Sequence, residues 1–256
     1  MKTEELETNL KVLYDELFEH FGLDKATGLF EDSKSRFSGY PYVGLKYAES
    51  KKKILFVGLD TGVDERASKN TYHTFCSRRN KIPVTGEGET YKKFKKPPLG
   101  SHMAGTYLMA LLLLSDCPDY PDCHSEWIRA KEQLLKSPDS VNRNILSSNK
   151  DNIPGNVLTY VAHTNIYNFV TVGRTKRSGN DDRRWRDLQY EIEFLKREIE
   201  VFHPDILVFQ SKDFSRGILR EVVKDFRAKY RVISGCHPSY RFANKVKDVQ
   251  SLAEQR

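Results

Sequence analysis

Residues 51–62 read KKKILFVGLDTG, and this stretch decides the fold class. Four apolar residues, Ile54 to Val57, follow three lysines and end at Gly58, where a turn begins. A short continuous apolar run between such signals predicts a strand that is buried on both faces. Strands of that kind belong to parallel sheets covered by helices, so we interpret the chain as an α/β protein.

The rest of the chain alternates between strand and helix patterns. Strands separated by helices pair in parallel and carry helices on both faces of the sheet. We therefore expect a single domain over residues 1–256, a three-layer αβα sandwich with a central four-stranded parallel sheet. The strands are expected at 54–57, in the middle of 157–169, at 206–209 and at 230–234, and the helices at 4–20, 103–114, 126–136, 183–202 and 214–229.

The charge balance favours an acidic partner. The chain carries a net charge of +7, and nucleic acid is the natural candidate for such a surface. The alternative, that the charge serves solubility alone, stays open. Many basic residues lie in the segment 62–100, which has little periodicity and is expected to be a long functional loop. Among them are Arg78 and Arg79, for which we expect contacts with phosphates, as for the basic residues at 174–177.

Cysteine usage and the N-terminal residues predict a reducing compartment. The four cysteines lie far apart except for one pair, and the chain begins with a polar amphipathic stretch rather than an apolar signal region. The longest apolar run, residues 109–114, is much shorter than the roughly 20 residues that a membrane span needs. We expect a cytoplasmic monomer, associated with the nucleoid in a prokaryote, that does not enter membranes.

Polar residues follow three of the four predicted strands: Asp60, Asn165, and His237 with Ser239. Because the carboxyl ends of parallel strands meet at one edge of a sheet, we expect these residues to converge on one crevice. A carboxylate, an amide and an imidazole can together stabilise a developing cation, read a base edge and donate to a departing anion. The alternative is that Asp60 and Asn165 only cap turns and that His237 is a satisfied turn histidine.

Taken in order, these segments resemble the uracil-DNA glycosylase superfamily. The first motif of that family has the form G-Q-D-P-Y or G-M/I/L-N-P-G, and the last is H-P-S; this chain has GLDTG at 58–62 and HPS at 237–239. Thr164-Asn165 is similar to the central T-N strand of the family. The helix at 195–202, followed by PDILV at 204–208, is similar to its segment of a helix and then a P-x-x-I-V strand.

The resemblance implies a reaction and the residues that perform it. The reaction is hydrolysis of the N-glycosidic bond of uracil, or of a related damaged base, flipped out of DNA during base excision repair. Asp60 would stabilise the oxocarbenium-like sugar and orient the attacking water, and His237 would stabilise the oxygen of the leaving pyrimidine. Asn165 would read the base edge, and Ser239 would hold a phosphate. Arg241 would fill the stack that the flipped nucleotide leaves.

The remaining implied substrate-binding positions surround the first motif. Gly58 and Leu59 precede the catalytic position, and Thr61 stands where the family has proline after it. The segment at 98–105 is similar to the family's P-F-x-G-x-A-G, which places Leu99 where an aromatic platform is expected. Phe75 is our candidate for the ring that stacks on the base.

No cofactor and no metal are expected. Family members with an iron–sulfur cluster use a close C-x-x-C pair, whereas five residues separate Cys117 from Cys123. These two cysteines and His124 would supply three zinc ligands without a fourth in reach. Two other functions stay open: a catalytically inactive nucleic-acid-binding protein of the same fold, and a hydrolase or binder of small nucleotides or bases. The phosphate-cradling loop G-x-x-x-x-G-K-S/T is absent from the sequence.

Overall fold

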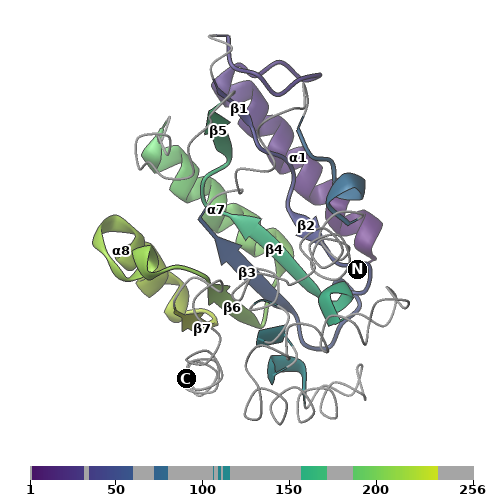
Figure 1. Cartoon of the computed structure of the whole chain (residues 1–256), viewed down its shortest axis with the longest axis vertical. Coiled ribbons are helices and arrows are strands. Elements are labelled where there is room, and N and C mark those ends of the chain that lie inside the picture. Colours follow the sequence, from purple (N-terminus) through teal and green to yellow (C-terminus); the bar gives the residue numbers. More distant parts are fainter. Residues whose placement is uncertain are drawn as a thin grey trace, which may run out of the picture.

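The computed structural model describes residues 2–31, 35–59, 72–79, 106, 109–110, 112–115, 157–171 and 187–235. Within these ranges the chain is a mixed α/β structure with a mostly parallel sheet (Figure 1). Its elements are α1 (Thr3–Phe21), β1 (Ser35–Phe37), β2 (Tyr42–Val43), β3 (Ile54–Gly58), the 3-10 helix η3 (Val157–Tyr160), β4 (Val161–Asn165), β5 (Phe169–Thr171), α7 (Leu188–Phe202), β6 (Ile206–Phe209), the 3-10 helix η5 (Lys212–Ser215), α8 (Gly217–Arg227) and β7 (Arg231–Ser234).

The main sheet has five strands in the order β2-β4-β3-β6-β7. Strands β4, β3, β6 and β7 run parallel and correspond to the four predicted strands, while β2 pairs antiparallel with β4. The prediction of four strands was therefore wrong, because it missed this edge strand. With only two residues, Tyr42 and Val43, β2 is too short to show an alternating pattern. A separate two-stranded sheet pairs β1 with β5.

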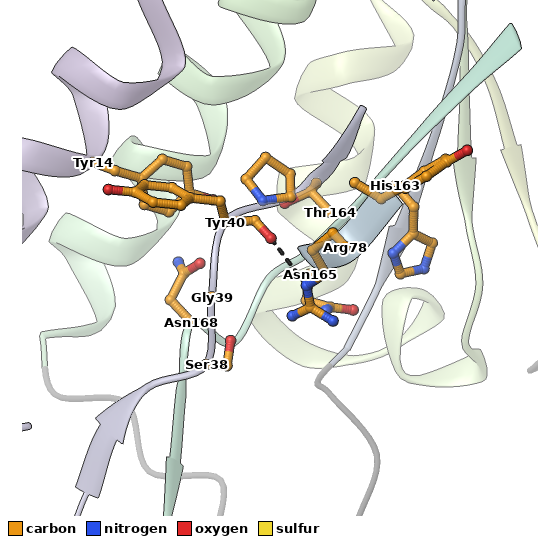
Figure 2. Close-up of a pocket in the computed structure, with 11 residues that line it drawn as sticks. Tyr14, Ser38, Gly39, Tyr40, Arg78, His163, Thr164, Asn165 and Asn168 are labelled. Atoms are coloured by element: carbon orange, nitrogen blue, oxygen red, sulfur yellow. Dashed lines mark hydrogen bonds between the residues drawn. The ribbon is translucent and has the colours of Figure 1, made fainter. Parts of the chain in front are cut away.

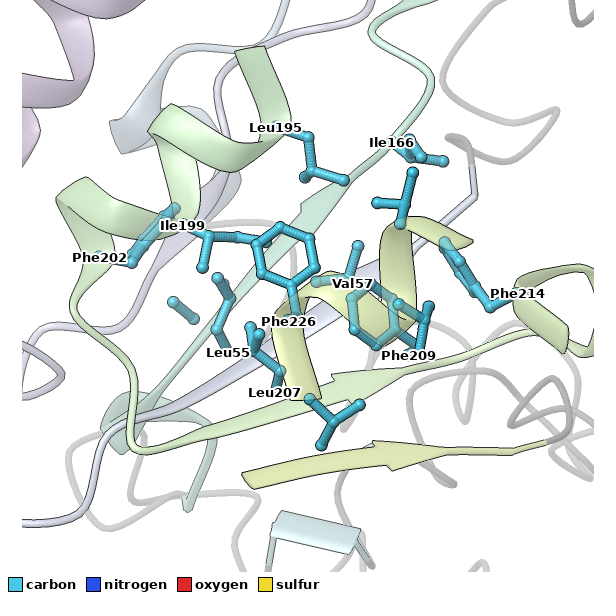
Figure 3. Close-up of a cluster of buried hydrophobic side chains, with 14 of the residues drawn as sticks. Leu55, Val57, Ile166, Leu195, Ile199, Phe202, Leu207, Phe209, Phe214 and Phe226 are labelled. Atoms are coloured by element: carbon cyan, nitrogen blue, oxygen red, sulfur yellow. The ribbon is translucent and has the colours of Figure 1, made fainter. Parts of the chain in front are cut away.

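The central strand β3 is buried on both faces, as its apolar run predicts. Ile54, Leu55, Phe56 and Val57 are all 0% exposed. Alternate residues of a strand point to opposite faces, so Leu55 and Val57 share one face. On that face they pack with apolar side chains of α1, α7 and α8 in one core cluster. Figure 3 shows members of this cluster from α7 and α8, such as Leu195 and Phe226.

The helix ends follow local capping rules. The first helix, α1, ends at Gly22, which takes the left-handed conformation with φ 63° and donates its N–H to the last turn. The side chain of Asp187 caps the start of α7 and accepts a hydrogen bond from the N–H of Tyr190 at 3.0 Å.

Two predicted segments differ from the structure. The helix predicted at 214–229 is divided into η5 and α8, because Arg216 is extended and Gly217 has a φ of 51°. The loop predicted at 62–100 contains helical residues at 75–79, a run too short for a periodic signal. The helix predicted at 126–136 lies outside the described residues.

A second core cluster connects α1 with the segment that leads to β2. It is mainly aromatic, and the ring of Tyr14 meets those of Phe37, Tyr40 and Phe194 at centroid distances of 5.3, 5.2 and 4.9 Å. Tilted and edge-on contacts of this kind stabilise aromatic pairs beyond the area they bury. The cluster therefore fixes residues 37–40 against α1, next to the carboxyl end of β4.

Candidate functional site

The carboxyl ends of β3 and β4 bring two predicted site residues together. Gly58 and Asn165 are register partners, each at the last position of its strand. Backbone pairing continues beyond them, since the N–H of Ile166 donates to the carbonyl oxygen of Gly58 at 3.0 Å and that of Tyr167 to Leu59 at 2.8 Å. The first two residues of the first motif, Gly58 and Leu59, are thus held beside the end of the T-N strand.

Gly58 leaves space for the side chains of β4. A Cβ at this position would lie closer to Oδ1 of Asn165 than Cβ atoms are found to approach, and 3.3 Å from Nε2 of His163. Oδ1 of Asn165 is buried, and no residue in the described part of the chain donates a hydrogen bond to it. A buried carbonyl oxygen without a donor carries a free-energy cost, so this amide is suited to accept an N–H group from a ligand.

Asn165 also borders a small polar cavity of about 10 Å³, roughly the space of one water molecule (Figure 2). Arg78 lines this cavity and donates from Nε to the carbonyl oxygen of Tyr40 at 3.1 Å. A pyrimidine ring is much larger than the cavity. The lining residues are Tyr14, Ser38, Gly39, Tyr40, Pro41, Tyr42, Arg78, His163, Thr164, Asn165 and Asn168.

Phe75, the candidate stacking ring, lies beside this cavity but does not line it. Its ring stacks on that of Tyr40 with a centroid distance of 4.6 Å and an interplanar angle of 14°. The side chain is half-buried and packs against both core clusters. Tyr40 therefore connects the Phe75 ring to the wall of the cavity.

The buried carboxyl group of Glu198 is the feature that the sequence interpretation missed. Its side chain is 0% exposed and accepts hydrogen bonds from the hydroxyl of Tyr14 at 2.6 Å and that of Thr164 at 2.9 Å. Burial raises the pKa of Glu198 to about 7, although both hydrogen bonds lower it. Glu198 stands three residues after Leu195 and four before Phe202, so its position on the apolar stripe of α7 was the available signal.

The structure gives Arg78 and Arg79 roles inside the protein. Arg78 is 5% exposed, and its guanidinium group donates to the backbone of Tyr40. Arg79 forms an ion pair with Glu7 of α1, and both side chains are mostly buried. The expected contacts of these two arginines with phosphates therefore find no support in this arrangement.

Leu59 packs into the main core, with 9% of its surface exposed, and contributes its backbone rather than its side chain to the strand edge. Other predicted site residues lie outside the described residues, and with them the basic segment at 174–177 and the cysteines at 117 and 123. These site residues are Asp60, Leu99, His237, Ser239 and Arg241.

The order of the strands gives a topological switch point between β3 and β6, at the same edge of the sheet. The chain leaves β3 towards β4 on one side and leaves β6 towards β7 on the other. In open α/β sheets, ligands bind where neighbouring connections diverge in this way, beyond the carboxyl ends of the strands. Leu59, which follows β3, and Gln210, which follows β6, flank this point.

Within the described ranges, no group of three or more His, Cys, Asp or Glu residues is arranged to hold a metal ion. None of the helices in that part of the chain has the length and apolar character that crossing a membrane requires. Comparisons with protein-family models, curated proteins and solved structures find no match to this chain.

Proposed function

We propose that the chain is a DNA N-glycosylase that removes uracil or a related damaged base and has the fold of the uracil-DNA glycosylase superfamily. The observation that carries the proposal is the pairing of Gly58 with Asn165 at the ends of adjacent parallel strands. It sets two separate motifs of the resemblance side by side. Asp60 follows Gly58 by two residues, so covalent geometry keeps their Cα atoms within about 8 Å of each other.

The proposed architecture is the three-layer αβα sandwich. One face of the sheet packs against α1, α7 and α8. Gln210 directly follows β6, and its side chain is on the opposite face of the sheet from Phe209. Its Nε2 donates to the hydroxyl of Thr106 at 2.8 Å. Thr106 belongs to the segment predicted as a buried helix at 103–114, and its described residues are helical. These contacts support a helical layer on that second face.

In the proposed reaction, Asn165 recognises the base. Uracil and thymine present an N–H group beside a carbonyl oxygen, which a single amide can match with its own oxygen and nitrogen. Oδ1 of Asn165, to which none of the described residues donates, supplies the acceptor for that N–H group. Because the cavity of about 10 Å³ is too small for the ring, the base is expected outside it, beyond the strand ends. Phe75 or Leu99 would then cover one face of the base.

Asp60 and His237 carry the chemistry in this proposal. As the N-glycosidic bond breaks, positive charge develops on the sugar and negative charge on the base. The Asp60 carboxylate stabilises the sugar and orients the water that attacks its anomeric carbon, and His237 stabilises the departing base oxygen. Ser239 holds a neighbouring phosphate and Arg241 fills the vacated stack. The products are the free base and an abasic site.

The test is strand cleavage, after alkali, of end-labelled oligonucleotides that carry uracil, a thymine mismatch, hypoxanthine or no lesion. Wild-type protein is compared with Asp60→Asn and His237→Ala. His20→Ala and Asp225→Asn serve as matched controls. They change the same residue types, but their side chains lie on helices α1 and α8 rather than at the strand ends. The proposal expects lesion-dependent cleavage that both site variants lose and both controls keep.

Other outcomes would select the alternatives. Binding to these oligonucleotides without any abasic product, at excess protein and over long incubation, would leave a nucleic-acid-binding protein of the same fold. Thermal stabilisation by free bases or nucleotides, but not by oligonucleotides, would instead indicate a small-molecule hydrolase or binder.

A further inference from the structure

We propose that Glu198 is a positioning residue that holds Asn165 and the Phe75 ring in place through Thr164 and Tyr14. The inference rests on the proposed function, since it concerns the two groups assigned there to the base. Glu198 itself lies behind the site on α7 and does not line the cavity next to Asn165.

The first connection runs through β4. The hydroxyl of Thr164 donates to the Glu198 carboxylate, 2.9 Å from Oε2 and 3.0 Å from Oε1. Thr164 is 2% exposed and directly precedes Asn165, so this bond anchors the end of β4 to α7. Asn165 itself gains no hydrogen bond at Oδ1 from the described part of the chain. Because Thr164 and Asn165 are consecutive residues of β4, a shift of the Thr164 backbone would also move Asn165.

The second connection runs through an aromatic series. The hydroxyl of Tyr14 donates to Oε1 of Glu198 at 2.6 Å. The ring of Tyr14 meets Tyr40 edge-on at 5.2 Å and 86°, and Tyr40 stacks on Phe75. Aromatic contacts of this kind are directional, so a displaced Tyr14 ring would also displace its neighbours. One carboxyl group thus supports both surfaces that would contact the base.

The proton on Glu198 determines which of these hydrogen bonds can form. As a carboxylate, Glu198 accepts from both hydroxyl groups. Once protonated, one of its oxygens becomes a donor, and the nearby oxygens are those of Thr164 and Tyr14. With the proton on Oε2, the partner at 2.9 Å is the hydroxyl oxygen of Thr164, which would then accept from Glu198 instead of donating to that oxygen. Burial raises the pKa of Glu198 to about 7, so this exchange falls near neutral pH.

Other ionisable groups surround the pair and are part of the same environment. Tyr14 of α1 has a pKa raised well above its usual value by burial and by the charge of Glu198, while Arg78 lowers it. Arg78, His163 of β4, Tyr40 and Tyr42 line the adjoining cavity. The Glu198→Gln variant separates the titration of Glu198 from theirs, because it keeps the shape and removes the charge.

The experiment uses the full chain and has two readouts. In the first, the side-chain amide resonances of Asn165, identified by their loss in Asn165→Asp, are followed from pH 5.5 to 8.5. The expected result is a shift with a midpoint near neutral pH that disappears in Glu198→Gln and in Thr164→Val. Thr164→Ser keeps the hydroxyl and keeps the shift. Glu191→Gln is the matched control, because Glu191 is also buried on α7 but meets the helix start at the N–H of Asp187.

The second readout is uracil excision. Glu198→Gln is expected to lower kcat at pH 8 by about tenfold, the effect of a misplaced base-recognition group. The Kd for lesion-free duplex DNA is expected to stay at the wild-type value, because Glu198 is not among the residues proposed to contact the DNA backbone. If wild-type protein excises no base, the proposed function fails, and the amide resonances alone decide the positioning role. The inference is overturned if the resonances of Asn165 do not move with pH, or are the same in Glu198→Gln and Glu191→Gln.

Discussion

Gly58 and Asn165 are opposite each other at the ends of β3 and β4, and the Asn165 amide occupies the space that any side chain at position 58 would need. The relationship is steric, so it requires glycine for the absence of a Cβ rather than for an unusual φ. The backbone carbonyl of Gly58 is meanwhile used by the N–H of Ile166. Neither backbone can therefore move away easily to make room.

Gly58→Ala is expected to displace the Asn165 amide and to lower the free energy of unfolding by about 1 to 3 kcal/mol, as overpacked sites do. Most of that loss should disappear when Asn165→Ala removes the amide. A double-mutant cycle from urea denaturation would measure this coupling, expected at about 1 to 2 kcal/mol. Equal losses in both backgrounds would show that another neighbour of Gly58, such as the His163 ring, and not Asn165, resists the added methyl group.

Glu198 is expected to make the stability of the protein depend on pH. Its pKa is raised to about 7 in the folded state from an ordinary value of 4.5, so the folded state binds the proton more tightly. The stabilising contribution is complete below pH 4.5 and is lost as the pH rises through 7. The size of the effect is about 3 kcal/mol.

Urea denaturation of wild-type protein and of Glu198→Gln at pH 5 and pH 8 would check this prediction. The variant, which cannot ionise, should gain stability relative to wild type as the pH rises between these values. A constant difference between wild type and Glu198→Gln at both pH values would mean that Glu198 ionises at its ordinary pKa.

The parallel strands were predictable because each burial pattern is local. The runs at 54–57 and 206–209 are continuously apolar, and both become strands with every residue buried. The edge strand β2 and the helical residues 75–79 were not predictable in this way, since neither is long enough to show a period. Their places depend on contacts with distant segments, such as the bridge between Gly39 and His73.

The partners of the charged residues could not be predicted from local sequence patterns either. A glutamate on a helix normally faces solvent, but Glu198 is buried by partners 184 and 34 residues away, Tyr14 and Thr164. Arg79 looked like a phosphate ligand in a basic loop, yet its partner Glu7 is on α1. Composition and spacing identify the chemical type of such residues. Only the tertiary fold determines which partner each one meets.

Phe75 is expected to matter for its flat ring as well as for its bulk. Phe75→Leu retains an apolar side chain between the two clusters but cannot stack, and stacking of an aromatic ring on a base is worth about 1 to 3 kcal/mol. We expect uracil excision at least tenfold slower in Phe75→Leu. Phe30→Leu is the matched control, because Phe30 is also a partly buried aromatic residue packed against a core cluster. If both variants excise uracil at the same rate, the platform role falls to Leu99.

Replacing Arg79 is expected to weaken the fold without changing the electrostatic part of DNA binding. Its guanidinium group is paired with Glu7, and the two side chains are only 22% and 16% exposed. The slope of log Kd against log salt changes by about 0.9 for each phosphate that the protein neutralises, so Arg79→Gln should leave the slope at the wild-type value. The unfolding free energy of this variant should fall by about 1 kcal/mol or more, because Glu7 is left buried without its cation.

The control for this prediction is Arg197→Gln, which also removes one positive charge. Arg197 pairs with another glutamate of α1, Glu16, at 2.7 Å. That pair is more exposed, at 44% and 46%, so its removal should cost less stability than removal of the Arg79 pair. Salt titrations of DNA binding and urea denaturation of both variants would measure the two effects separately. A slope reduced by about one unit in Arg79→Gln alone would show that Arg79 leaves Glu7 to bind a phosphate when DNA is present.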